Sequence, residues 1–288
     1  MTRVAAVDLG TNATRLLVAD VVDGRVDEIV RRTRITRLGE GVDERRRLLP
    51  VPIARVRNVL ADYRRELEAL GAERTLAVAT SAVRDADNGE AFLGEVEWSY
   101  GFATRLLSGD EEAALTLRGV GPLPATTLVI DVGGGSTELS ANGFRTSLDV
   151  GSVRLTERFG DDVDAAAAFV RSQLPELDAH RALGVDGTTA ELAAMAGAQV
   201  ISRTQLEDGL ARLAAAAPDE RRALLPLEPD RADVIVAGVA ILHEVMRRYG
   251  IETLEASTRD LLDGAALAAA ELPAPTDGAA PPGAYTCC

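Results

Sequence analysis

Two short turns carry residue types that bind phosphate groups, and each follows a strand-like run that ends in aspartate. Glycines in such a turn let backbone N–H groups converge on an anion without interference from side chains. The aspartate before each turn can hold a cation that neutralises the anion. For a single turn, an ordinary hairpin with a capping aspartate is the simpler interpretation. The residues are Asp8 with Gly10, Thr11 and Asn12 in one turn, and Asp131 with Gly133, Gly134, Gly135 and Ser136 in the other.

The two turns belong to an internal repeat. Residues 7–16 align without a gap with residues 130–139, with Asp, Gly, Thr and Leu in the same places, and a hairpin follows both copies. The duplication favours the phosphate-binding interpretation, because it predicts two related domains with equivalent turns facing each other across a cleft. Interfaces between domains are common sites for ligands.

Composition excludes several kinds of chemistry. The chain has 31 basic and 45 acidic residues, a net charge of −14, so overall basicity cannot attract nucleic acid or an anionic membrane. All basic residues are arginine, which excludes a Walker-A lysine and a Schiff base. Two histidines, and cysteines only at positions 287 and 288, exclude a polyhistidine or zinc-thiolate site and a catalytic thiol. Carboxylates, arginines and backbone amides remain, and the many acids suggest a divalent cation with oxygen ligands.

A pair of neighbouring glutamates divides into a structural and a candidate catalytic residue. Ser108 and Glu111 have the Ser-x-x-Glu spacing of a capping box at the start of a helix. Glu112 is not needed for the cap and points about 100° away from Glu111 around a helix. Glu112 can therefore face the cleft as a base, although a solvated helix acid is the simpler alternative.

The elements that must position these residues alternate between strands and helices, which predicts an α/β fold. Strands are expected at 3–9, 15–22 and 25–33 and again at 127–132, 137–141 and 144–150, with hairpin turns at Asp23-Gly24 and Asn142-Gly143. A Gly/Pro stretch at 119–124 divides the chain into domains 1–120 and 121–270, and the last helix of the second is free to pack back on the first. Residues 271–288 are Pro-rich and expected to be disordered. Without a signal peptide or an apolar run of membrane length, we expect a cytoplasmic protein.

The chain resembles the Ppx/GppA family of exopolyphosphatases and guanosine pentaphosphate phosphohydrolases. This family belongs to the acetate and sugar kinase, Hsp70 and actin superfamily. The resemblance therefore implies two ribonuclease-H-like domains with a cleft between them, and the length matches the short, two-domain members. The matching segments occur in family order at 7–16, 79–88, 107–113, 129–139, 151–157, 184–188 and 230–235.

The resemblance also implies a role for each matched residue. Glu112 corresponds to the catalytic glutamate, and Arg84 to an arginine at the cleft. Asp8 to Asn12 match the first phosphate loop. Ala13 stands where the family usually has Ser, and Asp186, where the family often has a small residue, adds negative charge near an anion site. The glycine-rich loop and cation site match Asp131, Gly133, Gly134, Gly135, Ser136 and Glu138, and a third phosphate loop matches Gly187 and Thr188.

Together the residues and the resemblance predict a phosphohydrolase that depends on Mg²⁺ or Mn²⁺. Its substrate is inorganic polyphosphate, cut from the end, or the 5′-γ-phosphate of guanosine pentaphosphate. Asp131 and Glu138, with Asp8, are the expected cation ligands. Two alternatives stay open: a small-molecule kinase of the same superfamily, and a regulator that binds a guanosine alarmone without turnover. Neither nucleic acid nor membrane is an expected partner, and a homodimer is left open.

Overall fold

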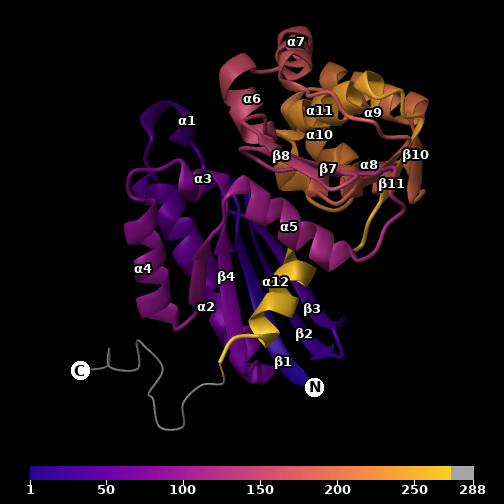
Figure 1. Ribbon diagram of the computed structural model, residues 1–288. Coiled ribbons are helices and arrows are strands. Elements are labelled where there is room, and N and C mark those ends of the chain that lie inside the picture. Colours follow the sequence, from indigo (N-terminus) through magenta and orange to yellow (C-terminus); the bar gives the residue numbers. More distant parts are fainter. Residues whose placement is uncertain (274–288) are drawn as a thin grey trace. The chain divides into compact units, whose positions relative to one another are not determined.

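The fold is described for residues 1–273 from a computed structural model (Figure 1). The chain forms two compact units. Unit 1 is Met1–Gly119 together with the chain from Leu261 onward, and unit 2 is Val120–Asp260. Helix α12 (Leu261–Ala270) belongs to unit 1, where it packs against β1, β2 and β4. The predicted disorder at 271–288 falls largely on residues 274–288, which lie outside the described residues.

Unit 1 is a five-stranded mixed sheet with helices on both faces. Alternate residues of β1 enter two separate cores, Val7 with α2 and α4 on one face and Ala6 with α5 and α12 on the other. Burial on both faces explains why this strand is apolar almost throughout. The strand order is β3-β2-β1-β4-β5. The elements are β1 (Thr2–Leu9), β2 (Ala13–Val22), β3 (Arg25–Ile35), α1 (Val42–Arg45), α2 (Pro50–Ala69), β4 (Arg74–Ala79), α3 (Ser81–Arg84), α4 (Gly89–Tyr100), β5 (Ala103–Leu106) and α5 (Gly109–Val120).

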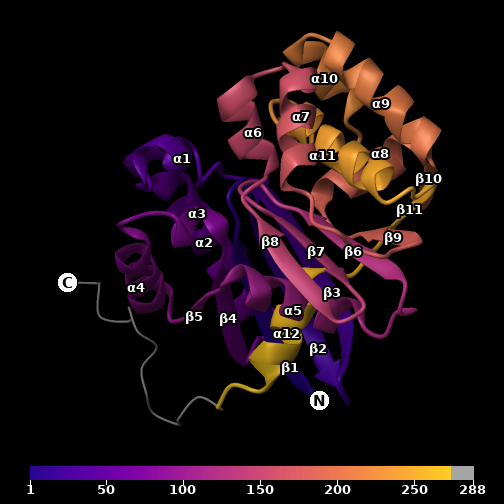
Figure 2. The ribbon, with the colours of Figure 1, turned by 45° about the horizontal axis from the view of Figure 1, so that its top comes forward.

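Unit 2 is a six-stranded mixed sheet with a layer of helices on one face (Figure 2). Its order is β10-β11-β9-β6-β7-β8, and Leu128 and Ile130 of β6 enter one core with α7, α9 and α11. The strands are β6 (Thr127–Val132), β7 (Thr137–Ala141), β8 (Phe144–Leu148), β9 (Arg181–Gly184), β10 (Val200–Ser202) and β11 (Thr253–Ala256). The helices are α6 (Ser152–Phe159), α7 (Val163–Gln173), α8 (Gly187–Ala196), α9 (Arg203–Ala215), α10 (Pro218–Leu224), η1 (Pro229–Arg231) and α11 (Ile235–Arg248).

The two sheets repeat one topology, which confirms the predicted α/β fold with two related halves. The order β3-β2-β1-β4-β5 corresponds strand for strand to β8-β7-β6-β9-β11, with β10 added at the edge. In both sheets the first three strands pair antiparallel and the next two pairings are parallel. Both predicted two-residue hairpins are also confirmed, since Asp23-Gly24 and Asn142-Gly143 have positive φ at each position.

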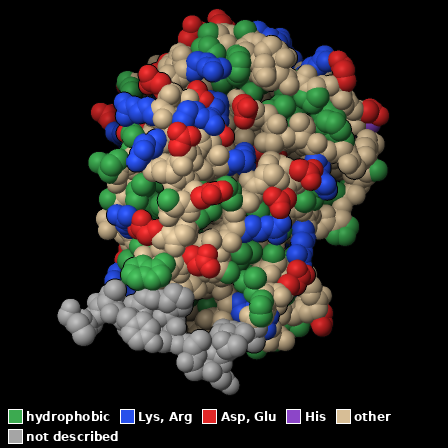
Figure 3. All heavy atoms as spheres, turned by 60° about the vertical axis from the view of Figure 1, so that its left-hand side comes forward, with side chains coloured by type: hydrophobic (Ala, Val, Ile, Leu, Met, Phe, Trp, Pro, Cys, Tyr) green, Lys and Arg blue, Asp and Glu red, His purple; other side chains and the backbone are tan. Residues whose placement is uncertain are grey.

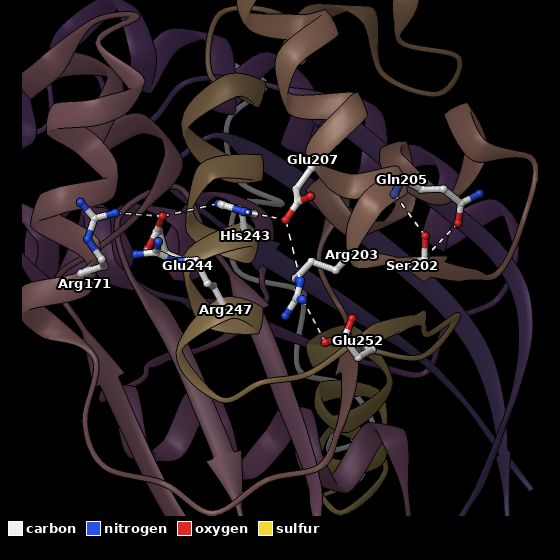
Figure 4. A network of polar contacts seen from close by, with 9 residues as sticks. All are labelled: Arg171, Ser202, Arg203, Gln205, Glu207, His243, Glu244, Arg247 and Glu252. Atoms are coloured by element: carbon white, nitrogen blue, oxygen red, sulfur yellow. Dashed lines mark hydrogen bonds and ion pairs between the residues drawn. The ribbon is translucent and has the colours of Figure 1, made fainter.

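A network of ion pairs ties the helical layer of unit 2 together (Figure 4). Glu244 of α11 is buried, and its Oε1 lies 3.0 Å from Arg171 Nη1 of α7. The neighbouring His243 Nε2 lies 3.4 Å from Glu207 Oε1 of α9. A buried carboxylate is tolerated only when it is paired, so these contacts fix α11 against both neighbours. Among residues 1–273, no helix has both the length and the apolar character needed to cross a membrane.

Candidate active site

The first predicted phosphate loop, Gly10 to Asn12, is a closed turn in unit 1. The Gly10 N–H donates to the Ala13 carbonyl at 3.0 Å, and a Cβ on Gly10 would approach that oxygen to 2.9 Å, so only glycine fits without a shift. The Asn12 side chain is buried, with 5% of the residue exposed, and neither its oxygen nor its nitrogen bonds to any other described residue. A buried amide in this state calls for a water molecule or a ligand as partner, and a phosphate oxygen is suited to accept from its nitrogen.

Asp8 lies beside the loop, but its charge is already balanced within unit 1. Asp8 and Arg15 are directly opposite each other on β1 and β2. The Arg15 Nε and Nη2 atoms both lie 2.8 Å from Asp8 Oδ2, and Asp8 is buried. A guanidinium therefore occupies one oxygen, Oδ2, of the carboxylate that the sequence offered to a metal ion. Arg15 has no role in the sequence interpretation, although its place in the hairpin register could have identified it.

The two predicted catalytic residues, Glu112 and Arg84, meet in unit 1. Glu112 is on the first turn of α5 and is only 6% exposed, so the alternative of a solvated helix acid is wrong. Arg84 ends α3, and its Nη1 lies 3.5 Å from Glu112 Oε2. The same nitrogen donates to the Leu107 carbonyl at 2.7 Å. The guanidinium is thus held in place beside a buried carboxylate.

Glu111 has the structural role expected from the capping box. Its Oε2 accepts the Ser108 backbone N–H at 2.9 Å, and its own N–H donates to Ser108 Oγ at 3.3 Å. Arg105 Nη2 lies 2.6 Å from Oε1. The backbone N–H of Ser108 and the Arg105 guanidinium lower the pKa of Glu111 to about 2. Glu111 therefore stays ionised as the cap of α5, while Glu112 has no part in that cap.

The glycine-rich loop of unit 2 is oriented by the start of α6. The Ser152 N–H donates to the Gly133 carbonyl at 3.0 Å and the Val153 N–H to the Gly134 carbonyl at 2.8 Å. Arg154 Nε donates to the Gly135 carbonyl at 2.8 Å.

The carbonyl and N–H of a trans peptide point in opposite directions, and no peptide bond among residues 1–273 is cis. Because the carbonyls of Gly133, Gly134 and Gly135 point toward α6, the N–H groups of Gly134, Gly135 and Ser136 point away from it. Three successive N–H groups on one side of a loop are suited to hold phosphate oxygens.

Two carboxylates lie side by side next to that loop. Asp131 and Glu138 are directly opposite each other on β6 and β7, the register that Asp8 and Arg15 have in unit 1. Glu138 is 2% exposed, and its Oε1 accepts a hydrogen bond from Ser147 Oγ at 2.6 Å. Like charges opposite each other on a sheet repel, which a cation would relieve.

The two carboxylates of Asp131 and Glu138 fit Mg²⁺ better than they fit a metal ion whose ligands all come from the protein. Within residues 1–273 there is no group of three or more His, Cys, Asp or Glu residues arranged to hold a metal ion. Mg²⁺ commonly keeps several waters and binds one or two carboxylates together with substrate phosphates. Asp131 and Glu138 supply two carboxylates from neighbouring strands, which meets that requirement.

The third predicted loop, Gly187 and Thr188, is organised by Asp186. Asp186 Oδ1 accepts the N–H groups of Thr188 at 2.7 Å and Thr189 at 2.9 Å, so this carboxylate is the N-cap of α8. Burial raises the pKa of Asp186, and the hydrogen bonds from Thr189 oppose that shift. The Thr188 N–H is thus used inside the fold, and a phosphate contact through Gly187 and Thr188 stays a prediction.

An arginine without an assigned role in the sequence interpretation covers the same loop. The guanidinium of Arg231, at the end of η1, lies where a Cβ on Gly187 would be. A side chain at this position would therefore have to displace the Arg231 guanidinium. The contact joins residues 44 positions apart, and no local pattern in the sequence indicates it.

Comparisons with known proteins show the family of the chain. A model of the Ppx/GppA phosphatase family matches residues 17–270. The chain is 39% identical to exopolyphosphatase 2 of Mycobacterium tuberculosis over 94% of this chain and 99% of that protein. It is 29% identical to guanosine-5′-triphosphate,3′-diphosphate pyrophosphatase of Vibrio vulnificus over 91% of this chain, which spans 58% of that protein.

Among solved structures, the Aquifex aeolicus member of the Ppx/GppA family superposes with a TM-score of 0.74 at 28% identity, over 93% of this chain and 97% of that one. An exopolyphosphatase from Cytophaga hutchinsonii has a TM-score of 0.82 at 23% identity, over 91% and 96% of the two chains, and shows the fold alone. The family model matches most of the chain, and the mycobacterial relative aligns with it over nearly the whole length of both proteins. The chain belongs to the Ppx/GppA phosphatase family and is a hydrolase of the exopolyphosphatase type.

Proposed function

We propose that the chain releases the terminal phosphate of inorganic polyphosphate, or the 5′-γ-phosphate of guanosine pentaphosphate, by attack of a water molecule that Glu112 deprotonates. The observation that carries the proposal is the burial of Glu112 beside Arg84, separate from the cap that Glu111 forms. The two substrates follow from the names of the mycobacterial and Vibrio relatives.

In this reaction the water oxygen bonds to the terminal phosphorus while the bridging P–O bond breaks. Glu112 accepts the water proton, and the shortened chain leaves as an anion. A positioned base of this kind contributes typically about 10²- to 10⁴-fold to the rate. Arg84, held by the Leu107 carbonyl, stabilises charge on the phosphoryl oxygens, which carry most of the charge in the loose transition state of phosphoryl transfer.

Unit 2 supplies the groups that bind phosphate and neutralise it. The N–H groups of Gly134, Gly135 and Ser136 bind phosphate oxygens. Asp131 and Glu138 would hold Mg²⁺ or Mn²⁺, which supplies charge neutralisation when it is bound. A share of Asp8 in cation binding stays a prediction, because Arg15 already pairs with it.

The deciding experiment measures phosphate release from polyphosphate and from guanosine pentaphosphate with Mg²⁺ and no acceptor. We expect release from at least one substrate, and its loss in Glu112→Gln. Transfer that requires an acceptor would favour the kinase alternative. Tight binding of guanosine pentaphosphate without release would favour the regulator. Either result would overturn the proposal.

A further inference from the structure

Three consecutive arginines, Arg45, Arg46 and Arg47, form an exposed group that we call the arginine cluster; it begins at the last residue of α1 in unit 1. Within residues 1–273, no carboxylate lies within ion-pair distance of any of the three. The three guanidinium groups are therefore not neutralised by ion pairs, although Asp43 and Glu44 directly precede them in α1.

Other exposed arginines of unit 1 behave differently, because acidic side chains are abundant. Arg25 pairs with Asp27, and Arg32 pairs with Glu66 of α2. Arg65 likewise pairs with an aspartate of α2. Figure 3 shows acidic and basic side chains interspersed over one face of the molecule. Three adjacent guanidinium groups without a carboxylate partner are suited to an anionic ligand.

The backbone of the cluster is fixed on one side to the loop that follows Arg84. The Arg46 carbonyl accepts the N–H of Asp87 at 2.7 Å. The Asn88 side chain bonds both the N–H and the carbonyl of Leu48, at 2.8 and 3.1 Å. The cluster is thus held by a segment that begins directly after a proposed catalytic residue.

The segment before the cluster is hydrogen-bonded to the first phosphate loop. The Gly39 N–H donates to the Thr11 carbonyl at 2.8 Å, and the Val42 N–H donates to the Gly39 carbonyl at 3.0 Å. A Cβ on Gly39 would collide with the Thr11 side chain, so this contact requires glycine. The chain then passes through α1 to Arg46, whose φ of 52° and ψ of 33° are left-handed. A residue with a side chain adopts this conformation at a cost, so the fold determines the position of the cluster.

We infer that the arginine cluster is a second binding site for polyphosphate, which holds the part of the chain beyond its terminal phosphates. The inference rests on the proposed function, because it takes polyphosphate as the substrate. Guanidinium groups bind phosphate oxygens in pairs of hydrogen bonds, and a linear polyanion offers such oxygens along its length. The cluster lies on residues 39–48, which hydrogen-bond to the first phosphate loop at Gly39 and to the loop after Arg84 at Arg46 and Leu48. A polyphosphate chain whose end is bound in the first phosphate loop can continue onto the cluster.

The test is the full chain with Arg45→Gln, Arg46→Asn and Arg47→Gln combined. Asn at position 46 tolerates the left-handed backbone. The matched control carries Arg25→Gln, Arg32→Gln and Arg65→Gln, which changes the net charge equally at exposed arginines that have acidic partners. The measurements are KM for long-chain polyphosphate and for tripolyphosphate, and binding of labelled long-chain polyphosphate with Mg²⁺ in the Glu112→Gln background.

We expect the cluster variant alone to lose affinity for the long chain, while its KM for tripolyphosphate changes less than about twofold. With about 0.7 counterions released per phosphate contact on a single-stranded polyanion, three contacts give a salt slope of about −2. Doubling the salt concentration should then weaken binding to the unmodified cluster about fourfold more than binding to the variant.

An unchanged salt slope would overturn the inference. So would an equal loss in the control variant, or an equal loss for tripolyphosphate, since both indicate a general effect of charge. Absence of phosphate release by the unmodified chain would instead count against the proposed function, and the binding measurement would still decide whether the cluster holds polyphosphate.

Discussion

Replacing Glu111 and Glu112 by Gln, one at a time, tests whether neighbouring carboxylates divide stability and catalysis between them. Glu111 caps α5 through Ser108 and pairs with Arg105, whereas Glu112 is buried beside Arg84. Glu111→Gln should therefore lower stability and leave turnover unchanged. Glu112→Gln should fold normally and lose about 10²-fold or more in turnover, the value of a positioned base.

The stability effect of Glu111 can be worked out from its surroundings. Its pKa falls from 4.5 to about 2, which at 1.36 kcal/mol per pKa unit corresponds to at most ~3.4 kcal/mol. The side chain is 41% exposed, so solvent screening reduces its contribution to about 1 kcal/mol. For a chain of this size, that amounts to about 2–4 °C in Tm.

The contribution of Glu111 to stability depends on pH in a definite direction. Because the pKa of Glu111 is lower in the folded protein than in the unfolded chain, its stabilising contribution is fully present above pH 4.5 and is lost as the pH falls toward about 2. The difference in Tm between the unmodified chain and Glu111→Gln should therefore be constant near neutral pH and shrink between those two values.

Thermal unfolding across this pH range, together with phosphate release at neutral pH, checks both statements. Glu90→Gln is the matched control, because Glu90 also lies in the first turn of a helix, α4, and should change Tm very little. Loss of turnover in Glu111→Gln with retention in Glu112→Gln would refute the assignment of the two glutamates. A Tm difference for Glu111→Gln that does not depend on pH would refute the pKa argument.

Three further predictions concern unit 2 and its loops. EDTA should abolish phosphate release and Mg²⁺ should restore it, and Asp131→Asn should raise the Mg²⁺ concentration needed for half-maximal rate; full activity in EDTA would exclude the proposed cation. Asp186→Ala should cost about 0.5–2 kcal/mol in chemical denaturation, because α8 loses its N-cap, while an unchanged midpoint would contradict that role. Gly133→Ala should lower phosphate release about tenfold or more, since its Cβ would lie 3.0 Å from the Ser136 carbonyl. Gly94→Ala, with nothing within 4 Å of the added carbon, is the control and should keep full activity.

Local patterns in the sequence determined the elements and their duplication. Asp23-Gly24 and Asn142-Gly143 specify two-residue hairpins, because these residue pairs tolerate positive φ at both positions. The spacing of Ser108 and Glu111 specifies a helix cap, because both hydrogen bonds close within four residues. The repeat of strand, aspartate and glycine turn predicted two related halves, and the matching strand orders confirm it.

Only the tertiary structure decided what those residues contact. The hairpin register places Asp8 opposite Arg15 in one half and Asp131 opposite Glu138 in the other, so equivalent aspartates have cross-strand neighbours of opposite charge. The burial of Glu112 depends on α5 packing against the sheet and on Arg84 from another segment. Contacts of this kind join residues distant in sequence, and their free energy comes from packing and charge pairing that no local pattern encodes.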